Sequence, residues 1–458
     1  MKRHATMEVS LENFGTDIMS EPTYETSSAL FERATEYLPG GNSRTTVWAA
    51  PFPVYAASGE GCWLTDVDGR RYLDLLNNYT SLLHGHAHPV IMDAVRGQLD
   101  IGTCFPLPTK SEVDFAELLC GRVPGFEQIR YANSGSEAVM IALKAARAHT
   151  GRPKIAKCEG SYHGSYDFAE VSLDSAPDTW GNAEPKSVPY SAGTPQSVLD
   201  EVVVIPFNHP EESERILRAN AAHLSCVLID PLPNRGGLIP ATREFLETLR
   251  RVTTELGMLL IFDEVISFRL GFEGAQGAFG VTPDLTTIAK IIGGGFPVGA
   301  VAGSRDVMAV FDPRRGKPLA PHGGTFNANP VTMVAGQAAM TLMTQDEFKR
   351  LDLLGDRIRD GAAQAFADTG VDGQITGMGS LFRIHMSSTP LIDYRASLAA
   401  ATQAPALAHV VQYLQDNGVL IAPTGLGALS TPMTEVEIDH FLEIFKSALL
   451  HNATRSAA

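Results

Sequence analysis

The chain has 458 residues, of which 44% are hydrophobic and 19% charged, with 42 Gly and 28 Pro. This composition is that of an ordinary globular protein and excludes the collagen-like, coiled-coil and disordered classes. The net charge of −16 argues against a nucleic-acid partner, because phosphate backbones are bound by clustered Lys and Arg.

Cysteine spacing and hydropathy indicate in which cellular compartment the protein is expected. The five cysteines are dispersed and form no CxxC pair, so the sequence predicts neither a disulfide framework nor a metal site, and a cytoplasmic location is expected. The first 15 residues lack an apolar core and predict no secretory signal. The apolar runs are of strand length, so no membrane span is expected.

The first half of the chain predicts an arm, a meander and then a layered α/β region. Residues 1–40 predict a polar arm with one helix near 27–37, and residues 59–74 predict a small β-meander around the turn Asp68-Gly69. From about residue 110, helical and short apolar segments alternate, which is typical of a mostly parallel sheet with helices on both faces. The expected helices are 111–122, 137–149, 210–221 and 241–256, and the expected strands are 128–132, 154–158, 202–205, 226–230 and 258–263.

The last third of the chain predicts a second domain. A long helix rich in Ala and Met begins near residue 331, a β-rich stretch passes through 381–386, and helices end near residue 450. We therefore expect an α/β fold with three segments. These are an arm with part of a small domain (1–75), a large domain (76–330) and a carboxy-terminal small domain (331–458).

Three segments carry groups that could bind one cofactor. Asn133 to Ala138 (NSGSEA) lies where a strand gives way to a helix, and free N–H groups at a helix start suit a phosphate. The alternative is a helix merely capped by Ser136. Asp263 ends an apolar strand, where ligands of parallel sheets bind, although an N-cap or a loop ion pair would explain it too. Lys290 stands between apolar residues and three glycines; burial would lower its pKa and favour Schiff-base chemistry, whereas most lysines are simply solvated.

Two further loops fit the same explanation. Gly160 to Gly164 (GSYHG) offers Tyr162 for stacking on a flat ring, and His322 to Pro330 (HGGTFNANP) is a loop of small and polar groups before a helix. A surface tyrosine and an ordinary turn are the plainer alternatives. A helix start, an aromatic ring, a carboxylate and a lysine together match the phosphate, ring face, ring nitrogen and aldehyde of pyridoxal 5'-phosphate. The glycine triplet lacks the spacing of a nucleotide loop.

The order of NSGSEA, GSYHG, DEV, AKIIGGGFPVGA and HGGTFNANP resembles that of the class-III aminotransferases over nearly the whole chain. The resemblance implies the fold type I architecture, with a mostly parallel seven-stranded type of sheet in a large domain and a smaller α+β domain from both termini. It also implies a homodimer, or a tetramer, with the active site at the subunit interface. The partners it implies are small-molecule amine and carbonyl substrates.

The same resemblance implies roles for individual residues. Lys290 matches the Schiff-base lysine and Asp263 matches the carboxylate that keeps the pyridine nitrogen protonated. The other matches to cofactor-binding positions are Gly135 and Ser136 for the phosphate, Tyr162 for stacking, Val265 for packing behind the ring, and Thr325 for the phosphate of the neighbouring subunit.

The substrate pocket resembles one branch of the family. Residues 39–44 and 51–53 are similar to glutamate-1-semialdehyde aminomutases and β-amino-acid aminotransferases, and the direct step from Ser43 to Arg44 looks more like the β-phenylalanine aminotransferases. In those enzymes the matching arginine holds the substrate carboxylate, whereas the plainer alternative for Arg44 is a surface ion pair. Trp48 and Tyr79 would suit an aryl or alkyl amine, or they could be core residues.

One position departs from the pattern of these relatives. Thr424 stands where the β-amino-acid enzymes carry an arginine that grips the keto-acid acceptor, and Arg235 is a candidate substitute because it follows a sheet strand. We expect an aminotransferase that moves an amino group from a β-amino acid or related amine to a keto acid or aldehyde, with pyridoxamine phosphate as the intermediate form of the cofactor. The alternatives are a glutamate-1-semialdehyde 2,1-aminomutase, which needs no external acceptor, and a non-catalytic protein that keeps the fold.

Overall fold

The computed structural model describes residues 24–182 and 184–456. The chain divides into two compact units, one made of Met1–Ala57 with Thr65–Arg70 and the other of Ser58–Leu64 with Arg71–Ala458. Residues 1–15, for which the sequence predicts no secretory signal, lie outside the described residues. The three-segment domain boundaries stay a prediction.

The smaller unit contains the predicted amino-terminal helix. Helix α1 (Glu25–Thr35) begins and ends two residues before the predicted bounds. Its first turn is held by Asp68, whose carboxylate accepts hydrogen bonds from the Thr26 N–H at 2.7 Å and from the Ser27 hydroxyl at 2.6 Å. The short 3-10 turns Pro39–Gly41 and Thr45–Val47 follow. The predicted turn at Asp68 therefore also caps this helix.

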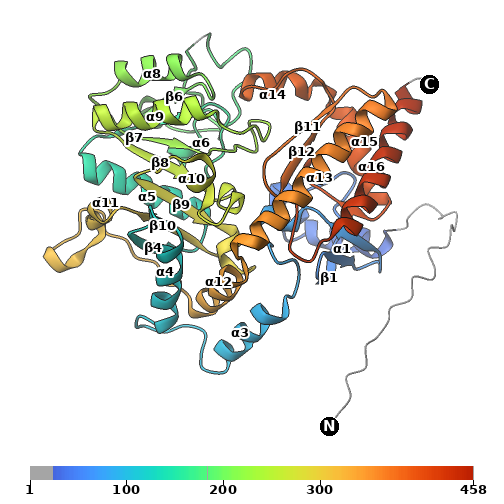
Figure 1. The fold of residues 1–458 in the computed structure, drawn as a ribbon, viewed down its shortest axis with the longest axis horizontal. Coiled ribbons are helices and arrows are strands. Elements are labelled where there is room, and N and C mark those ends of the chain that lie inside the picture. Colours follow the sequence, from blue (N-terminus) through green and yellow to red (C-terminus); the bar gives the residue numbers. More distant parts are fainter. Residues whose placement is uncertain (1–23, 183, 457–458) are drawn as a thin grey trace. The chain divides into compact units, whose positions relative to one another are not determined.

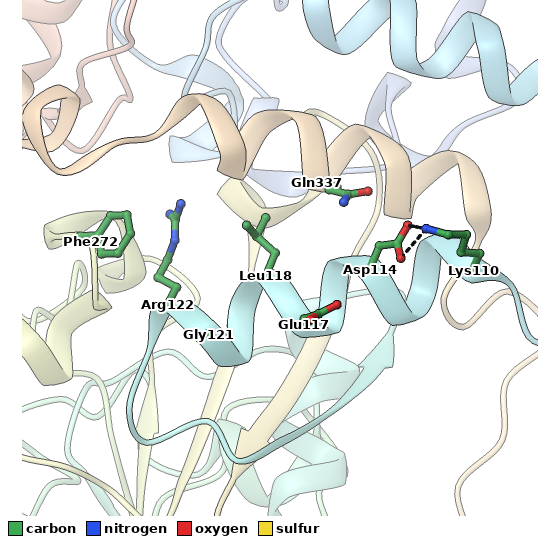
Figure 2. A pocket seen from close by; sticks show the side chains of 8 residues that line it. All are labelled: Lys110, Asp114, Glu117, Leu118, Gly121, Arg122, Phe272 and Gln337. Atoms are coloured by element: carbon green, nitrogen blue, oxygen red, sulfur yellow. Dashed lines mark hydrogen bonds and ion pairs between the residues drawn. The ribbon is translucent and has the colours of Figure 1, made fainter.

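A seven-stranded sheet lies in the larger unit, with helices packed around it (Figure 1). Strands β5 to β9 pair in parallel, and β10 lies antiparallel between β4 and β9. The prediction of a mostly parallel seven-stranded sheet is confirmed. The order is β4 (Gln128–Ala132), β10 (Gly299–Gly303), β9 (Leu285–Ala289), β8 (Leu259–Asp263), β7 (Leu224–Ile229), β5 (Lys154–Cys158) and β6 (Val202–Ile205).

Helices cover both faces of this sheet. Alternate strand residues point to opposite sides: Ile155 and Ile261 pack in the cluster that contains α5 (Gly135–Thr150), whereas Ala156 and Leu260 pack in the cluster that contains α8 (Pro210–Ala219) and α9 (Arg243–Leu256). Because both faces are buried, the strands read as continuous apolar runs. All the loops that carry the predicted cofactor residues, apart from Thr325, follow the strands of this sheet.

The carboxy-terminal third of the chain forms the predicted helices and β-rich stretch (Figure 1). Helix α12 (Pro330–Leu342) is followed by α13 (Gln345–Thr369), and α13 packs against α16 (Glu435–Ser456). A three-stranded antiparallel sheet has the order β11 (Gln374–Thr376), β12 (Leu381–His385), β14 (Leu426–Ala428). Strand β13 (Val419–Leu420) instead pairs in parallel with β3 (Arg71–Asp74).

Shorter elements complete the described chain. The predicted meander contains β1 (Ala56–Glu60), β2 (Trp63–Asp66) and β3. No described helix is long and apolar enough to cross a membrane. The remaining helices are α2 (Asn77–Thr80), α3 (Pro89–Leu99), α4 (Lys110–Arg122), α6 (Asp167–Glu170), α7 (Gln196–Asp200), α10 (Gly274–Phe279), α11 (Arg305–Met308), α14 (Tyr394–Ala400) and α15 (Ala404–Asp416).

The aromatic core between α13, α16 and β12 makes a testable contribution to stability. Phe441 is fully buried, and its ring lies 5.7 Å from that of Phe445 and 5.5 Å from that of Phe382. We expect Phe441→Ala to lower the free energy of unfolding by about 3–5 kcal/mol, because it removes a buried ring and leaves a cavity. Val436→Ala, at a position 71% exposed on the same helix, is the matched control. Equal urea midpoints for the two variants would contradict this packing.

Candidate active site

The start of α5 forms one wall of the site. Ser134 is the N-cap residue, and its side chain accepts a hydrogen bond from the Glu137 N–H at 3.2 Å. The capping alternative placed this role at Ser136, which is wrong, because Ser136 lies two residues inside the cap. Its hydroxyl instead accepts from the Ser165 N–H at 3.1 Å. The N–H groups of the first turn, with the positive end of a 16-residue helix, suit a phosphate.

Close backbone approaches bring the predicted residues of this wall together. A Cβ added at Gly135 would lie 3.0 Å from both methyl groups of Val265, so Gly135 is in contact with the residue predicted behind the cofactor ring. A Cβ added at Gly164 would lie 2.4 Å from the Ser136 hydroxyl oxygen. The loop that carries Tyr162 therefore packs directly on the start of α5.

Asp263 lies at the carboxyl end of β8, and its side chain is oriented from two sides. One carboxylate oxygen lies 2.7 Å from Nδ1 of His163. The other accepts hydrogen bonds from the Thr287 hydroxyl at 3.0 Å and from the Val265 N–H at 3.1 Å. Asp263 is only 4% exposed, and a buried carboxylate is tolerated when it is hydrogen-bonded in this way.

His163 is a site residue that the sequence reasoning left without a role. It is buried, and burial lowers its pKa despite the opposing effect of Asp263. Its Nε2 has no hydrogen-bond partner among the described residues. The available signal was its place beside Tyr162 in GSYHG, but the loop alone does not show that the imidazole points at Asp263 rather than at solvent.

Lys290 follows β9 directly and has a backbone φ of 51°. The left-handed region is uncommon for a residue with a side chain, and such residues cluster at functional sites. Burial lowers the pKa of the Lys290 amine, and the negative charges of Asp263 and Asp230 partly oppose that effect. A lowered pKa increases the fraction of neutral amine, which is the nucleophilic and basic form.

A second buried carboxyl group lies near Lys290. Asp230 follows β7, and one of its carboxyl oxygens accepts a hydrogen bond from the Leu232 N–H at 2.9 Å. Burial and the neighbouring charge of Asp263 raise the pKa of Asp230 to about 8. Asp230 therefore carries a proton near neutral pH. Two carboxyl groups held in different environments are a common feature of acid–base sites.

The other predicted residues lie in more open places. Tyr162 is 48% exposed, and Thr325 is exposed on the loop before α12. Tyr79 is partly buried in a left-handed turn in which Asn77, Asn78, Tyr79 and Thr80 have φ values of 48°, 46°, 55° and 74°. Arg235 is exposed, and its Nη2 lies 3.0 Å from Asp174.

Arg44 and Trp48 belong to the smaller unit, where both are exposed. A lysine amine of lowered pKa, a hydrogen-bonded carboxylate and a helix start with a close glycine approach thus lie together in the larger unit. Each is a chemical partner for one group of pyridoxal phosphate, so the residues present fit that cofactor. No group of three or more His, Cys, Asp or Glu side chains in the described part of the chain could hold a metal ion.

Comparison with known proteins identifies the family. The family model of class-III aminotransferases matches residues 45–449. A glutamate-1-semialdehyde 2,1-aminomutase of Methanothermobacter thermautotrophicus is 39% identical over 369 residues, which cover 80% of this chain and 85% of that protein. Further curated relatives, from Aeropyrum pernix and Desulfotalea psychrophila, carry the same name.

Two solved structures are also similar to this chain. An omega-transaminase from Sphaerobacter thermophilus is 53% identical with a TM-score of 0.91, and the match covers 93% of this chain and 98% of that one. A β-phenylalanine aminotransferase from Variovorax paradoxus is 35% identical with a TM-score of 0.83, and the match covers 92% and 93%.

The chain therefore belongs to the class-III aminotransferase family. It has the fold type I architecture of pyridoxal-phosphate transferases and is an enzyme of that family, as the sequence predicted. Class-III aminotransferases use pyridoxal phosphate, so the predicted cofactor is confirmed as well. The non-catalytic alternative is wrong.

Replacing Lys290 tests its assignment as the Schiff-base lysine. If Lys290 is the Schiff-base lysine and general base that the sequence predicts, Lys290→Ala should abolish the visible absorbance of lysine-bound cofactor and lower turnover by a factor of at least about 10²–10⁴. Lys349→Ala, which removes an exposed lysine with a side chain 73% exposed, should leave both unchanged. A variant at 290 that keeps the colour and the turnover would refute the assignment.

The raised pKa of Asp230 predicts a pH effect on stability. The native carboxyl holds its proton up to about pH 8, whereas an unfolded aspartate releases it near 3.8. The native state thus binds more protons between these values, so this group makes the protein less stable as pH rises through that window. Asp230→Asn should make the free energy of unfolding fall less steeply between pH 4 and 8 than in the wild type. Parallel pH profiles from urea titrations would show that Asp230 is not protonated in the folded protein.

Proposed function

We propose that this protein is a transaminase that takes an amino group from a β-amino acid or a related amine and gives it to a separate keto acid or aldehyde. The observation that carries the proposal is the 53% identity, over nearly the whole chain, to a protein described as an omega-transaminase. The 35% identity to a β-phenylalanine aminotransferase supports the choice of amine. The choice of amine is also supported by Arg44, which directly follows Ser43 in a segment that resembles the β-phenylalanine aminotransferases.

Each residue of the site has a separate role in the proposed reaction. When bound, the cofactor supplies a protonated pyridine ring that takes up the electron pair left on the amine-bearing carbon. Asp263, oriented by His163 and Thr287, holds the proton on the ring nitrogen. Lys290, with its lowered pKa, would remove the proton from that carbon and deliver it to the former aldehyde carbon of the cofactor. The N–H groups at Gly135 and Ser136 hold the phosphate.

The remaining proposed contacts concern the cofactor ring and the substrate. We assign Val265 to one face of the ring and Tyr162 to stacking. For the amine substrate, Arg44 binds a carboxylate through its planar fork, which suits bidentate pairing. Trp48 and Tyr79 offer apolar surface for an aryl or alkyl group.

An aminomutase is the second candidate, because the curated relatives at 37–39% identity carry that name. Glutamate-1-semialdehyde aminomutation moves the amino group within one molecule and needs no external acceptor. The need for an acceptor therefore separates the two candidates more cleanly than the choice of donor does.

A half-reaction experiment tests the proposal. Purified holoenzyme is mixed with β-phenylalanine, 1-phenylethylamine or glutamate-1-semialdehyde, and the cofactor absorbance is followed without an acceptor. We expect the first two amines to bleach the colour and an added keto acid to restore it. Formation of 5-aminolevulinate from the semialdehyde without an acceptor, together with no bleaching by the two amines, would establish the aminomutase instead.

We also propose a homodimer, with Thr325 serving the phosphate of the neighbouring subunit. Large apolar side chains that are at least 44% exposed follow one another along the segment of α3, α4 and their connection. They are Val90, Leu99, Ile101, Phe105, Leu107 and Val113. Exposed apolar surface of this kind commonly marks a protein interface. A cytoplasmic location is in keeping with the five free cysteines.

Sedimentation tests the dimer. Ile101 is 71% exposed, and Ile101→Asp would bury a charge in the proposed interface, so we expect it to shift the protein to monomer and to reduce cofactor retention. Ile392→Asp, at a position 54% exposed and outside that segment, is the control. A monomeric wild type, or an Ile101→Asp variant that stays dimeric, would contradict the proposed interface.

The role of Arg44 separates substrates with and without a carboxylate. We expect Arg44→Ala to raise KM for β-phenylalanine about 10-fold or more while changing KM for 1-phenylethylamine little, because only the former loses a charge-assisted hydrogen bond. Arg33→Ala, at an exposed position of α1, provides the matched control. Equal effects on both amines would remove Arg44 from the carboxylate site.

A further inference from the structure

An arginine from the three-stranded sheet reaches the loop that follows β7. Residues 230–238 form this loop, and its Gly237 carbonyl accepts a hydrogen bond from the Thr376 hydroxyl at 2.6 Å and lies 3.1 Å from His385 Nε2. Arg383 is two residues before His385 in β12, so both side chains stand on the same face of the strand. That face therefore packs against the loop, at the carboxyl end of β7.

Arg383 is held by carbonyl groups rather than by a carboxylate. Its Nε donates to the Thr424 carbonyl at 3.1 Å, and its Nη1 donates to the Asn234 carbonyl. Within residues 24–182 and 184–456, no carboxylate forms an ion pair with Arg383, and no residue accepts a hydrogen bond from its Nη2. The guanidinium is thus fixed in place with part of its donor edge unused.

A second guanidinium lies close by. Burial lowers the pKa of Arg383 to about 10, and the positive charge of Arg235 acts in the same direction. Arg235 is paired with Asp174 at 3.0 Å, whereas Arg383 has no carboxylate partner among the described residues, so one of the two positive charges is left without an ion-pair partner. A local excess of positive charge in a recessed place attracts an anion, and guanidinium forks match carboxylates in particular.

The position of this pair relates it to the reaction. The loop begins at Asp230, whose carboxyl group is close enough to Lys290 for each charge to affect the pKa of the other. The second carbonyl that holds Arg383 belongs to Thr424, between β13 and β14. Arg383 is therefore fixed to the same loop whose first residue, Asp230, lies near Lys290.

We propose that Arg383, with Arg235 beside it, binds the carboxylate of the keto-acid acceptor. This inference rests on the proposed transaminase function. Arg383 contacts the substrate and takes no part in proton transfer. A purely structural role, in which Arg383 only ties β12 to the loop, would disturb all substrates equally, and this difference is what an experiment can measure.

The experiment compares two acceptors that differ in the carboxylate. Enzyme in the pyridoxamine phosphate form is mixed with pyruvate or with propanal. We expect Arg383→Met to raise KM for pyruvate about 10–100-fold, the range for a lost charge-assisted hydrogen bond, and to leave KM for propanal within about 3-fold. Arg383→Lys keeps the charge without the fork and should fall between the wild type and Arg383→Met. Arg357→Met, which removes an exposed arginine paired with Asp439, should change neither.

A binding measurement tests the proposal without relying on turnover, and a folding check shows that a loss of binding does not come from an unfolded variant. Propanoate, which cannot react, is titrated calorimetrically into holoenzyme, and thermal melting checks that each variant is folded. We expect the Kd for propanoate to rise about 10-fold or more in Arg383→Met, with partial rescue in Arg383→Lys. Equal losses for pyruvate and propanal, or unchanged propanoate binding, would overturn the proposal. If the wild type transfers no amino group to any acceptor, the proposed transaminase function fails, and the keto acid falls with it as the ligand of Arg383. The propanoate titration still tests whether Arg383 binds a carboxylate.

Discussion

The buried contact between Asp263 and His163 is the interaction around which the site is organised. A carboxylate that is 4% exposed is costly unless its oxygens are occupied, and here the imidazole, the Thr287 hydroxyl and the Val265 N–H occupy them. These groups come from the loop after β5, from β9 and from the loop after β8. Satisfying one charge therefore fixes the relative positions of three segments, and the loop after β5 in turn packs on the helix start through Gly164 and Ser136.

The electrostatics of the centre follow from the same arrangement. Asp263 raises the pKa of Asp230, and both acids oppose the effect of burial on Lys290. A protonated acid and a readily neutralised amine thus lie near one hydrogen-bonded carboxylate. Pairs of titratable groups whose pKa values are moved apart by their surroundings are what acid–base chemistry near neutral pH requires. The parallel strands contribute by bringing these residues to one edge of the sheet, since Asp263 is the last residue of β8, and Asp230 and Lys290 directly follow β7 and β9.

Local sequence signals were enough to predict much of the fold and the cofactor, but not the contacts between distant segments. Apolar runs predicted β4, β5 and β6 with their observed bounds, because strands buried on both faces contain few polar residues. The sequence does not predict strand β9, because Thr286 and Thr287 interrupt its apolar run. The structure gives a reason for Thr287: its hydroxyl donates a hydrogen bond to Asp263. The N-cap was placed at Ser136 rather than Ser134 because both serines can cap a helix. The roles of His163, Asp230 and Arg383 depend on partners about 30 to 150 residues away, and no spacing rule reports such contacts.

The left-handed turn from Asn77 to Thr80 has a consequence for laboratory evolution at Tyr79, which we propose as a substrate contact. Each residue held in this region costs about 1–2 kcal/mol. The turn is kept by Asp74, whose carboxylate accepts hydrogen bonds from the Leu76 and Asn77 N–H groups, and by the Asn77 amide, which donates to the Ala428 carbonyl at 2.7 Å. Branching at Cβ makes positive φ still less favourable. A library at position 79 should therefore be enriched in replacements that are not branched at Cβ, such as Phe, His, Leu or Asn, and depleted in Val and Ile, whatever amine is used for selection.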